Sequence, residues 1–231
     1  MKEEYKILND MGYTNDKIDT LLSLGYTIKD ILKINRKTNI IATYSNKSII
    51  DKFNYLLSLG FSKIETISIT TICPQIYCYK QDSIKTKFDN LMSLEYTYEE
   101  VKIMIINYPA ILNTSLEYIK EKIEFYNSIG LHNVLIKDTS HLITSLSLVY
   151  ARYMFLKGKG VTIDEKSYRK LFMRSKQFQK KYNISSEELI NKYPYKTNKK
   201  RVPNSRITKP VEETMSTKYY GMINYLVQLG Y

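Results

Sequence analysis

The sequence predicts an all-α protein, a right-handed-type helical-repeat solenoid of about five units of 30–35 residues. Two observations point to repeats: one motif recurs along the chain at a nearly fixed interval, and prolines recur at the same interval. A third excludes strands, because no segment shows the sustained alternation of apolar and polar residues that an exposed strand needs. Each unit is expected to bury its apolar faces against its neighbours in the chain.

The recurring motif is an apolar stretch that ends in glycine and an apolar residue. It reads KIDTLLSLGY at 17–26, KFNYLLSLGF at 52–61, KFDNLMSLEY at 87–96 and KIEFYNSIGL at 122–131. A fifth copy, RYMFLKGKGV at 152–161, follows after a shorter interval of 30 residues. Because glycine readily adopts the left-handed conformation that closes many helices, each copy is expected to end a long helix.

Four glycines are therefore predicted helix stops, and one unit lacks the glycine. The stops are Gly25, Gly60, Gly130 and Gly160, whereas Glu95 takes the equivalent place in the third unit. A residue with a Cβ atom is strained in the left-handed region. We expect a local cost in stability at Glu95.

The same 35-residue interval separates Pro74 from Pro109. Each proline follows a short apolar segment, such as 98–107, whose apolar face includes Val101 and Met104. A proline cannot donate a backbone hydrogen bond and pushes the preceding residue out of helical geometry. We expect it to end a short second helix and to turn the chain toward the next long helix, which the capping-box pattern from Thr114 to Glu117 predicts to begin.

These units resemble the repeat of the mitochondrial transcription termination factor (mTERF) family. The resemblance lies in the pattern L-x-S-L-G-[YF], then an apolar helix, then [YC]-P-x-I-[LY]. It is closest in YPAIL at 108–112 and LEYIKEKIEFYNSIG at 116–130. It covers about residues 17–195 and includes YNISSEELINKYPY at 182–195, which looks like the family's closing element. It implies a curved superhelix whose basic concave path holds nucleic acid, usually duplex DNA, in organellar transcription or RNA handling.

Two other helical arrays have units of similar length. Tetratricopeptide units carry a small-residue pattern in their helix pair that is absent here. Pentatricopeptide units bind single-stranded RNA one base per repeat, and their two helices are of similar length and need no proline before the next unit. The mTERF-like interpretation is favoured over both.

The expected domain organisation has four parts: an N-terminal capping helix at 1–16, the mTERF-like array at 17–195, a basic flexible linker at 196–210 and a C-terminal helix at 211–231. No apolar run approaches the roughly 18 residues of a membrane span. The N-terminal segment MKEEYKILND resembles neither a secretory signal nor a transit peptide. We expect a cytoplasmic monomer that does not contact membranes, and a bacterial or mobile-element origin stays open.

The residue types that carry chemistry are scarce. Two cysteines and two histidines do not form a closed zinc site at any motif spacing. The sequence contains no nucleophile elbow, phosphate-cradling glycine loop or metal-spaced carboxylate pair. We therefore predict no catalytic residues, no metal and no cofactor, and a protein that is not an enzyme.

The net charge of +12 is concentrated in one region. Residues 152–209 contain 17 of the 35 Lys and Arg residues and only 4 of the 23 Asp and Glu residues, and the rest of the chain is close to neutral. Codons rich in A and T would raise the lysine content everywhere. A regional excess instead indicates a polyanionic partner.

Within this region, a helix is predicted from about Glu165 to Tyr182, with one face basic and the opposite face apolar. A solvated lysine face would normally carry carboxylates as well, and none lies between Lys166 and Tyr182. Nucleic acid is the favoured partner, with a plain surface or an acidic membrane or protein partner as alternatives. The candidate nucleic-acid-binding residues are Lys166, Arg169, Lys170, Arg174, Lys176, Lys180, Lys181, Lys199, Lys200, Arg201, Arg206, Lys157, Lys159 and Arg152.

A weaker signal is the cation that opens each copy of the motif. These residues are Lys17, Lys52, Lys87, Lys122 and Arg152. Equivalent places in a repeat array line up along one side, so the five cations could form a functional row. Helix-surface ion pairing, such as Lys122 with Glu121 or Glu124, explains them about as well.

The predicted function is nucleic-acid binding, with duplex DNA favoured over RNA, in transcription regulation or termination. The C-terminal basic helix and the basic arm that follows it would neutralise phosphates. Since most cations are lysines, we predict weak sequence preference, with Arg169 and Arg174 as the best candidates for base contact. The alternative is a helical scaffold that binds or inhibits an acidic protein.

Overall fold

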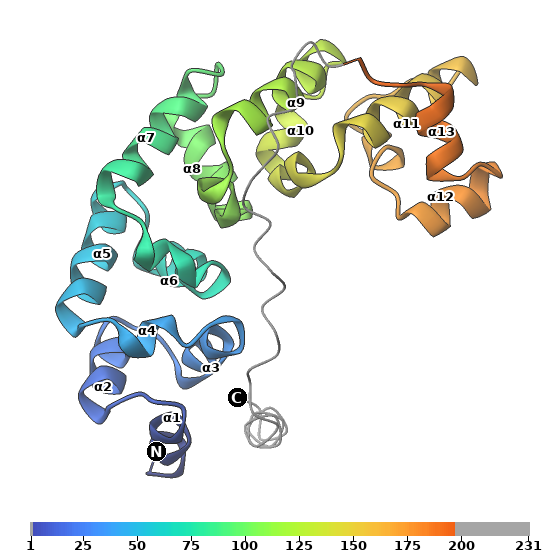
Figure 1. Ribbon diagram of the computed structural model, residues 1–231. Helices are drawn as coiled ribbons and strands as arrows, with labels where there is room; N and C mark the ends of the chain where they lie inside the picture. Colours follow the sequence, from blue (N-terminus) through green and yellow to red (C-terminus); the bar gives the residue numbers. More distant parts are fainter. Residues whose placement is uncertain (1, 197–231) are drawn as a thin grey trace. The chain divides into compact units, whose positions relative to one another are not determined.

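The computed structural model describes residues 2–196, and these are helical throughout their regular secondary structure (Figure 1). The described part has thirteen α-helices and four 3-10 helices and no strand. The predicted all-α helical-repeat class is thereby confirmed, and the handedness of the stack stays a prediction. Most of the predicted linker at 196–210 and the whole predicted helix at 211–231 lie outside the described residues.

The described chain forms two compact units that divide between Lys85 and Thr86. In the first unit, α2 and α5 lie along one side and α3 and α6 along the other (Figure 1). Its elements are α1 (Lys2–Asp10), α2 (Asn15–Ser23), α3 (Ile28–Lys37), α4 (Ile40–Thr43), α5 (Asn46–Ser58), α6 (Lys63–Ile72) and the 3-10 helix η1 (Pro74–Cys78).

The second unit ends in shorter helices. Helix α7 (Gln81–Met92) begins just before the boundary and belongs mostly to this unit. The elements that follow are α8 (Tyr98–Asn107), η2 (Pro109–Asn113), α9 (Leu116–Ser128), α10 (His132–Lys137), η3 (Thr139–Ile143), α11 (Leu146–Gly158), η4 (Tyr168–Lys170), α12 (Ser175–Tyr182) and α13 (Ser186–Lys192).

The predicted helix stops are confirmed in the backbone. Gly25, Gly60, Gly130 and Gly160 all have positive φ angles, between 73° and 98°. Glu95 has a φ of 71°, although it carries a Cβ atom. The third repeat therefore makes the same left-handed turn as the other repeats, although the Cβ atom of Glu95 disfavours that conformation.

The prolines act as predicted. Pro74 and Pro109 each follow the last residue of a short helix by two positions and begin η1 and η2. The opening of the next long helix differs by one residue from the prediction: Ser115, not Thr114, caps α9, because its side chain accepts a hydrogen bond from the backbone N–H of Tyr118. Thr114 instead closes η2.

The short second helices explain the change of interval from 35 to 30 residues. Helices α3, α6 and α8 have ten residues each and open with capping boxes at Thr27, Ser62 and Thr97. Helix α10 has six residues, and Leu131 at its start supplies no side-chain cap. The fourth repeat has lost a turn of its second helix together with the cap.

The apolar faces meet in the interior of each unit. Val101, Met104 and Ile105 of α8 are fully buried, as predicted for the short helix, and so are Ile123 and Tyr126 of α9. No helix among the described residues is both long enough and apolar enough to cross a membrane. Residues 2–196 also bring no three His, Cys, Asp or Glu side chains together in an arrangement that could hold a metal ion.

Candidate nucleic-acid interface

The cations that open the repeats point into the protein and bind backbone. Lys17, Lys52, Lys122 and Arg152 are buried and Lys87 is half-buried. In the first three copies the ammonium group donates to a carbonyl 27 residues further on: Lys17 to Tyr44, Lys52 to Tyr79 and Lys87 to Thr114. Each acceptor is the residue that ends the repeat, so the cation ties the first helix of its repeat to the end of the same repeat.

The last two copies make the same closure over a shorter span. The Nζ atom of Lys122 lies 2.5 Å from the carbonyl oxygen of Leu142 and 3.9 Å from the centroid of the Tyr118 ring. One guanidinium nitrogen of Arg152 donates to the carbonyls of Leu171 and Met173, at 2.9 and 2.7 Å. Burial lowers the pKa of both cations.

These contacts correct one predicted site residue. Arg152 is 1% exposed and its guanidinium lies over the Phe178 ring, 4.7 Å from the centroid. The prediction that Arg152 contacts nucleic acid is wrong, because the charged group is enclosed and donates to backbone. The five-cation row is a structural row, and surface ion pairing does not account for it either.

The predicted helix from Glu165 to Tyr182 is also wrong, because the structure breaks it in two. Asp164 accepts hydrogen bonds from the backbone N–H groups of Lys166 and Ser167 and starts a turn that leads into η4. The chain then leaves helical geometry until α12 begins at Ser175. Arg152 pairs with the carbonyls that this break exposes, at Leu171 and Met173.

The separation of basic from apolar residues survives the break. Tyr168, Leu171 and Phe178 are buried, as the apolar face of the predicted helix requires. Most of the predicted basic residues on these elements are exposed, and Lys170 is half-buried. We call the exposed set the terminal basic surface; it consists of Lys157, Lys159, Lys166, Arg169, Arg174, Lys176, Lys180 and Lys181.

Two lysines of this surface border one aromatic pair. Phe155 of α11 and Tyr182 of α12 lie with their ring centroids 5.8 Å apart. The Nζ atom of Lys159 is 5.2 Å from the Phe155 centroid, and that of Lys181 is 5.6 Å from the Tyr182 centroid. The packing of α11 on α12 thereby brings together the charges of two elements that are distant in sequence.

A second group of cations gathers around Arg169. Its Nε atom donates to the Tyr168 hydroxyl at 3.3 Å, and that hydroxyl in turn donates to Asp138. Beside it is a hollow of about 250 Å³ that is also lined by Lys166 and Lys137. Lys137, on α10, was missed by the sequence reasoning because it lies outside the basic region and reaches the hollow only through the fold.

The segment that carries Arg169 is held by ring stacking. His141 of η3 stacks on Phe172 with the ring centroids 3.6 Å apart and the planes within 1° of parallel. Burial lowers the pKa of His141, and its imidazole is therefore neutral at neutral pH. A neutral ring avoids placing another positive charge in the packing beneath Arg169.

Three of the four carboxylates nearest in sequence to the terminal basic surface are engaged in local structure. Asp164 caps the turn described above, and Glu188 accepts from the backbone N–H of Ser185 at the start of α13. Glu165 accepts a hydrogen bond from the Asn133 side chain at 3.1 Å. Within residues 2–196, no ion pair joins a carboxylate to any of the eight cations.

The described chain ends against α11 and α9. The ring of Tyr195 packs against Tyr150 of α11, with centroids 5.1 Å apart, and against Phe125 of α9. The predicted arm residues Lys199, Lys200, Arg201 and Arg206 follow directly in sequence and lie outside the described residues. Their role stays a prediction.

Comparison with known proteins gives one positive finding. A family model described as mTERF matches residues 4–179, which is well over half of the chain. A search of curated proteins finds no match.

Proposed function

The chain belongs to the mTERF family, whose members are non-enzymatic, nucleic-acid-binding helical-repeat proteins, and from this premise we propose that it binds duplex DNA through the terminal basic surface. Membership confirms two predictions made from the sequence: the family resemblance and the absence of enzymatic activity. What we propose beyond membership is the choice of duplex DNA, the residues that contact it and the role in transcription.

One observation carries it: eight exposed cations on α11, η4 and α12 and their connections make no ion pair with a carboxylate among the described residues. The like charges of such a surface repel one another and attract a polyanion. Binding to duplex DNA replaces the condensed counterions of the phosphates with lysine and arginine side chains, and the released ions favour the complex.

The aromatic residues of the second unit support a duplex over a single strand. Single-strand binders offer exposed rings on which bases stack. Here Tyr168 and Phe178 are buried, and Phe155 packs against Tyr182. The surface offers charge with few free rings, which suits the regular phosphate rows of a duplex.

The arm at 196–210 is expected to extend the contact, since Lys199, Lys200, Arg201 and Arg206 follow the fixed ring of Tyr195. Basic arms of this kind run along phosphates or enter a groove. A DNA-bound helical-repeat protein of this family would act in the regulation or termination of transcription.

Two measurements test the proposal. In an electrophoretic competition, duplex DNA is expected to displace a labelled duplex probe at lower concentration than single-stranded DNA or RNA of the same sequence. In a salt series, contact with roughly 6–10 phosphates lowers the affinity about 10³–10⁵-fold between 50 and 200 mM salt. A flat salt series contradicts phosphate contact, and preferential displacement by RNA contradicts the choice of duplex DNA.

A further inference from the structure

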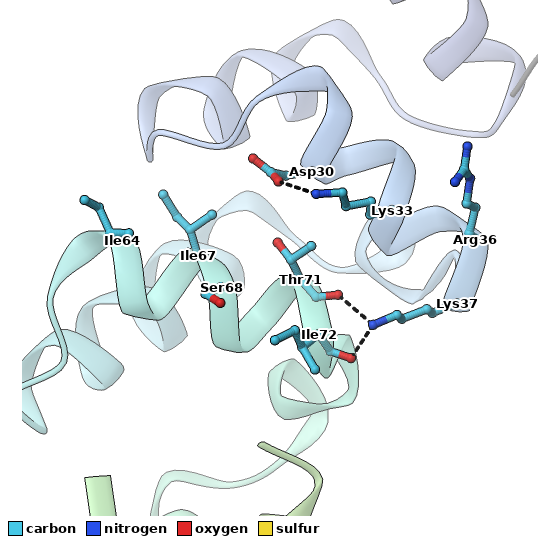
Figure 2. Close-up of a pocket in the computed structure, with 9 residues that line it drawn as sticks. All are labelled: Asp30, Lys33, Arg36, Lys37, Ile64, Ile67, Ser68, Thr71 and Ile72. Atoms are coloured by element: carbon cyan, nitrogen blue, oxygen red, sulfur yellow. Dashed lines mark hydrogen bonds and ion pairs between the residues drawn. The ribbon is translucent and has the colours of Figure 1, made fainter. Parts of the chain in front are cut away.

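The first unit carries a groove that the proposed function does not use. It lies between α3 and α6 and has a volume of about 580 Å³ (Figure 2). One wall is mostly basic, with Lys33, Arg36 and Lys37 projecting from α3 beside the single carboxylate of Asp30. The other wall is apolar, with isoleucines along α6.

The apolar wall is unusually exposed. Ile64 is 81% exposed and Ile72 is 48% exposed, although both belong to a helix whose other face is packed. They stand eight residues apart on α6, which is about 12 Å of helix. Large side chains exposed along such a length, beside a row of charges, indicate a surface that a partner covers.

Hydrogen bonds between α3 and α6 fix the two walls of the groove relative to each other. The Nζ atom of Lys37 donates to the carbonyls of Thr71 and Ile72, at 3.2 and 2.6 Å, and so ties the end of α3 to the end of α6 (Figure 2). Below the groove, the buried hydroxyl of Tyr26 bonds to those of Thr70 and Tyr77. A preformed site costs a ligand less ordering entropy on binding.

The charge of the basic wall faces outward. Lys33 pairs with Asp30 at 3.8 Å, across one turn of the same exposed helix surface. Arg36 is exposed and makes no hydrogen bond or ion pair that the described residues provide. Arg36 is therefore available to a carboxylate of a ligand, and Lys33, whose side chain is 49% exposed, can add a second contact beside its long pairing with Asp30.

We propose that the α3–α6 groove binds an acidic amphipathic α-helix of a partner protein. Apolar residues of that helix, at i, i+3, i+4 and i+7, pack on Ile64, Ile67 and Ile72, and acidic residues along its edge meet Arg36 and Lys33. Nucleic acid fits this groove poorly, because phosphates gain nothing from a wall of isoleucines. The site is separate from the terminal basic surface.

The test uses the full chain and fluorescence anisotropy. The probes are a set of labelled helical peptides of about 18 residues, each with leucines at i, i+3, i+4 and i+7 and glutamates at the flanking positions. One matched set replaces glutamate with lysine, and another replaces leucine with serine. Binding by acidic members and loss of binding in both matched sets support the proposal.

Protein variants locate the site. The double change of Ile64→Ser with Ile72→Ser, and the single change Arg36→Glu, are each expected to weaken binding of the acidic peptide about tenfold or more. Ile50→Ser on α5 and Lys29→Glu, outside the groove on α3, are the matched controls and are expected to leave it within about twofold. A lysine peptide that binds Arg36→Glu better than it binds the unchanged protein supports charge pairing at this position.

Four outcomes overturn the proposal. They are no binding by any acidic peptide, equal binding by the lysine set, groove variants that bind as well as the controls, and displacement of the acidic peptide by another ligand. Displacement by a synthetic peptide of residues 211–231 would assign the groove to the chain's own C-terminal segment. Displacement by duplex DNA would assign the groove to nucleic acid. If DNA does not bind the terminal basic surface, the proposed function fails, but the peptide-binding result at the groove is unaffected.

Discussion

The Nζ atom of Lys87 donates a 2.6 Å hydrogen bond to the carbonyl oxygen of Thr114, 27 residues further along the chain. Lys17 and Lys52 make the same contact over the same separation. The short helical segment that ends each of these repeats, α4, η1 or η2, leaves carbonyls without helical partners, and a long side chain from the repeat's first helix reaches them. The lysine recurs at this place because backbone acceptors recur there.

The first prediction concerns the most enclosed of these lysines. Lys122→Met keeps the length and apolar stem of the side chain and removes the group that donates to Leu142. An unpaired buried carbonyl costs about 1–3 kcal/mol, so the free energy of unfolding is expected to fall by that amount in urea denaturation. Lys120→Met, on the exposed face of α9, is the control and should change stability little. Equal stability of Lys122→Met and the unchanged protein would contradict the structural role.

A second prediction separates Arg152 from the exposed cations. Arg152→Met removes the donor to the carbonyls of Leu171 and Met173 and is expected to lower the free energy of unfolding by about 2–4 kcal/mol. Lys180→Ala with Lys181→Ala should leave stability nearly unchanged and reduce the salt slope of duplex binding by about 2, one for each phosphate contact. If Arg152→Met, measured while folded, lowers the slope and the double variant does not, the assignments are reversed.

The repeat pattern explains why much of the fold could be predicted. Glycines at Gly25, Gly60, Gly130 and Gly160 predicted the left-handed turns, and Pro74 and Pro109 predicted the ends of the short helices. Both are local backbone effects that a residue type imposes wherever it stands. The repeat multiplies the signal, because each stop is seen in several copies.

The errors arose where a distant residue changes what the backbone can do. A helical wheel drawn from Glu165 to Tyr182 contains no sign that Arg152 pairs with the carbonyls at Leu171 and Met173, and that pairing lets the helix break at low cost. The same contact hides Arg152 from solvent. Lys137 was missed for a related reason, since only the fold brings α10 beside Lys166. The exposure of the cations on α12 could be predicted without knowledge of contacts to distant residues.

A third prediction tests the strained turn of the third repeat. Glu95 is exposed at a φ of 71°, where glycine has no steric penalty. Glu95→Gly is expected to raise the free energy of unfolding by about 1 kcal/mol, since relief of strain outweighs the added freedom of the unfolded chain. Gly130→Ala is the reciprocal control: its φ is +75° with open space around the Cβ position, and it should lose about 1 kcal/mol. A loss of stability in Glu95→Gly would contradict this account.

A fourth prediction concerns alkaline pH. Burial raises the pKa of Tyr26 and of Tyr79 from 10.0 to about 12. Between pH 10 and pH 12 the unfolded chain has therefore lost phenolic protons that the folded chain retains, and stability falls as the pH rises. Burial lowers the pKa of Lys17 and Lys122 from 10.5, which has the opposite effect below that pH, and it lowers the pKa of Arg152 from 12.5, which offsets part of the decline above it. The net decline is expected above about pH 10.5.

Urea midpoints across this range, recorded together with tyrosinate absorbance, measure the effect. Tyr26→Phe removes hydrogen bonds to Thr70 and Tyr77, so it should be less stable at neutral pH but lose less stability on going to high pH. An unchanged midpoint up to pH 12 would mean that Tyr26 is not enclosed as its pKa of about 12 requires.

The last prediction distinguishes the two exposed arginines of the terminal basic surface from its six lysines. Guanidinium groups can pair with guanine through two hydrogen bonds, whereas ammonium groups act as point charges. Arg174 stands at the start of α12, and Arg169 is positioned through Tyr168. Arg169→Lys and Arg174→Lys keep the charge, so they should leave nonspecific affinity and salt slope nearly unchanged and reduce discrimination between duplex sequences, by up to about 1–3 kcal/mol for a base-contacting residue. Selection from a random duplex pool measures this discrimination between sequences. Lys176→Arg is the control for side-chain exchange. If both arginine variants select the same sequences as the unchanged protein with equal strength, these two residues contact phosphates only.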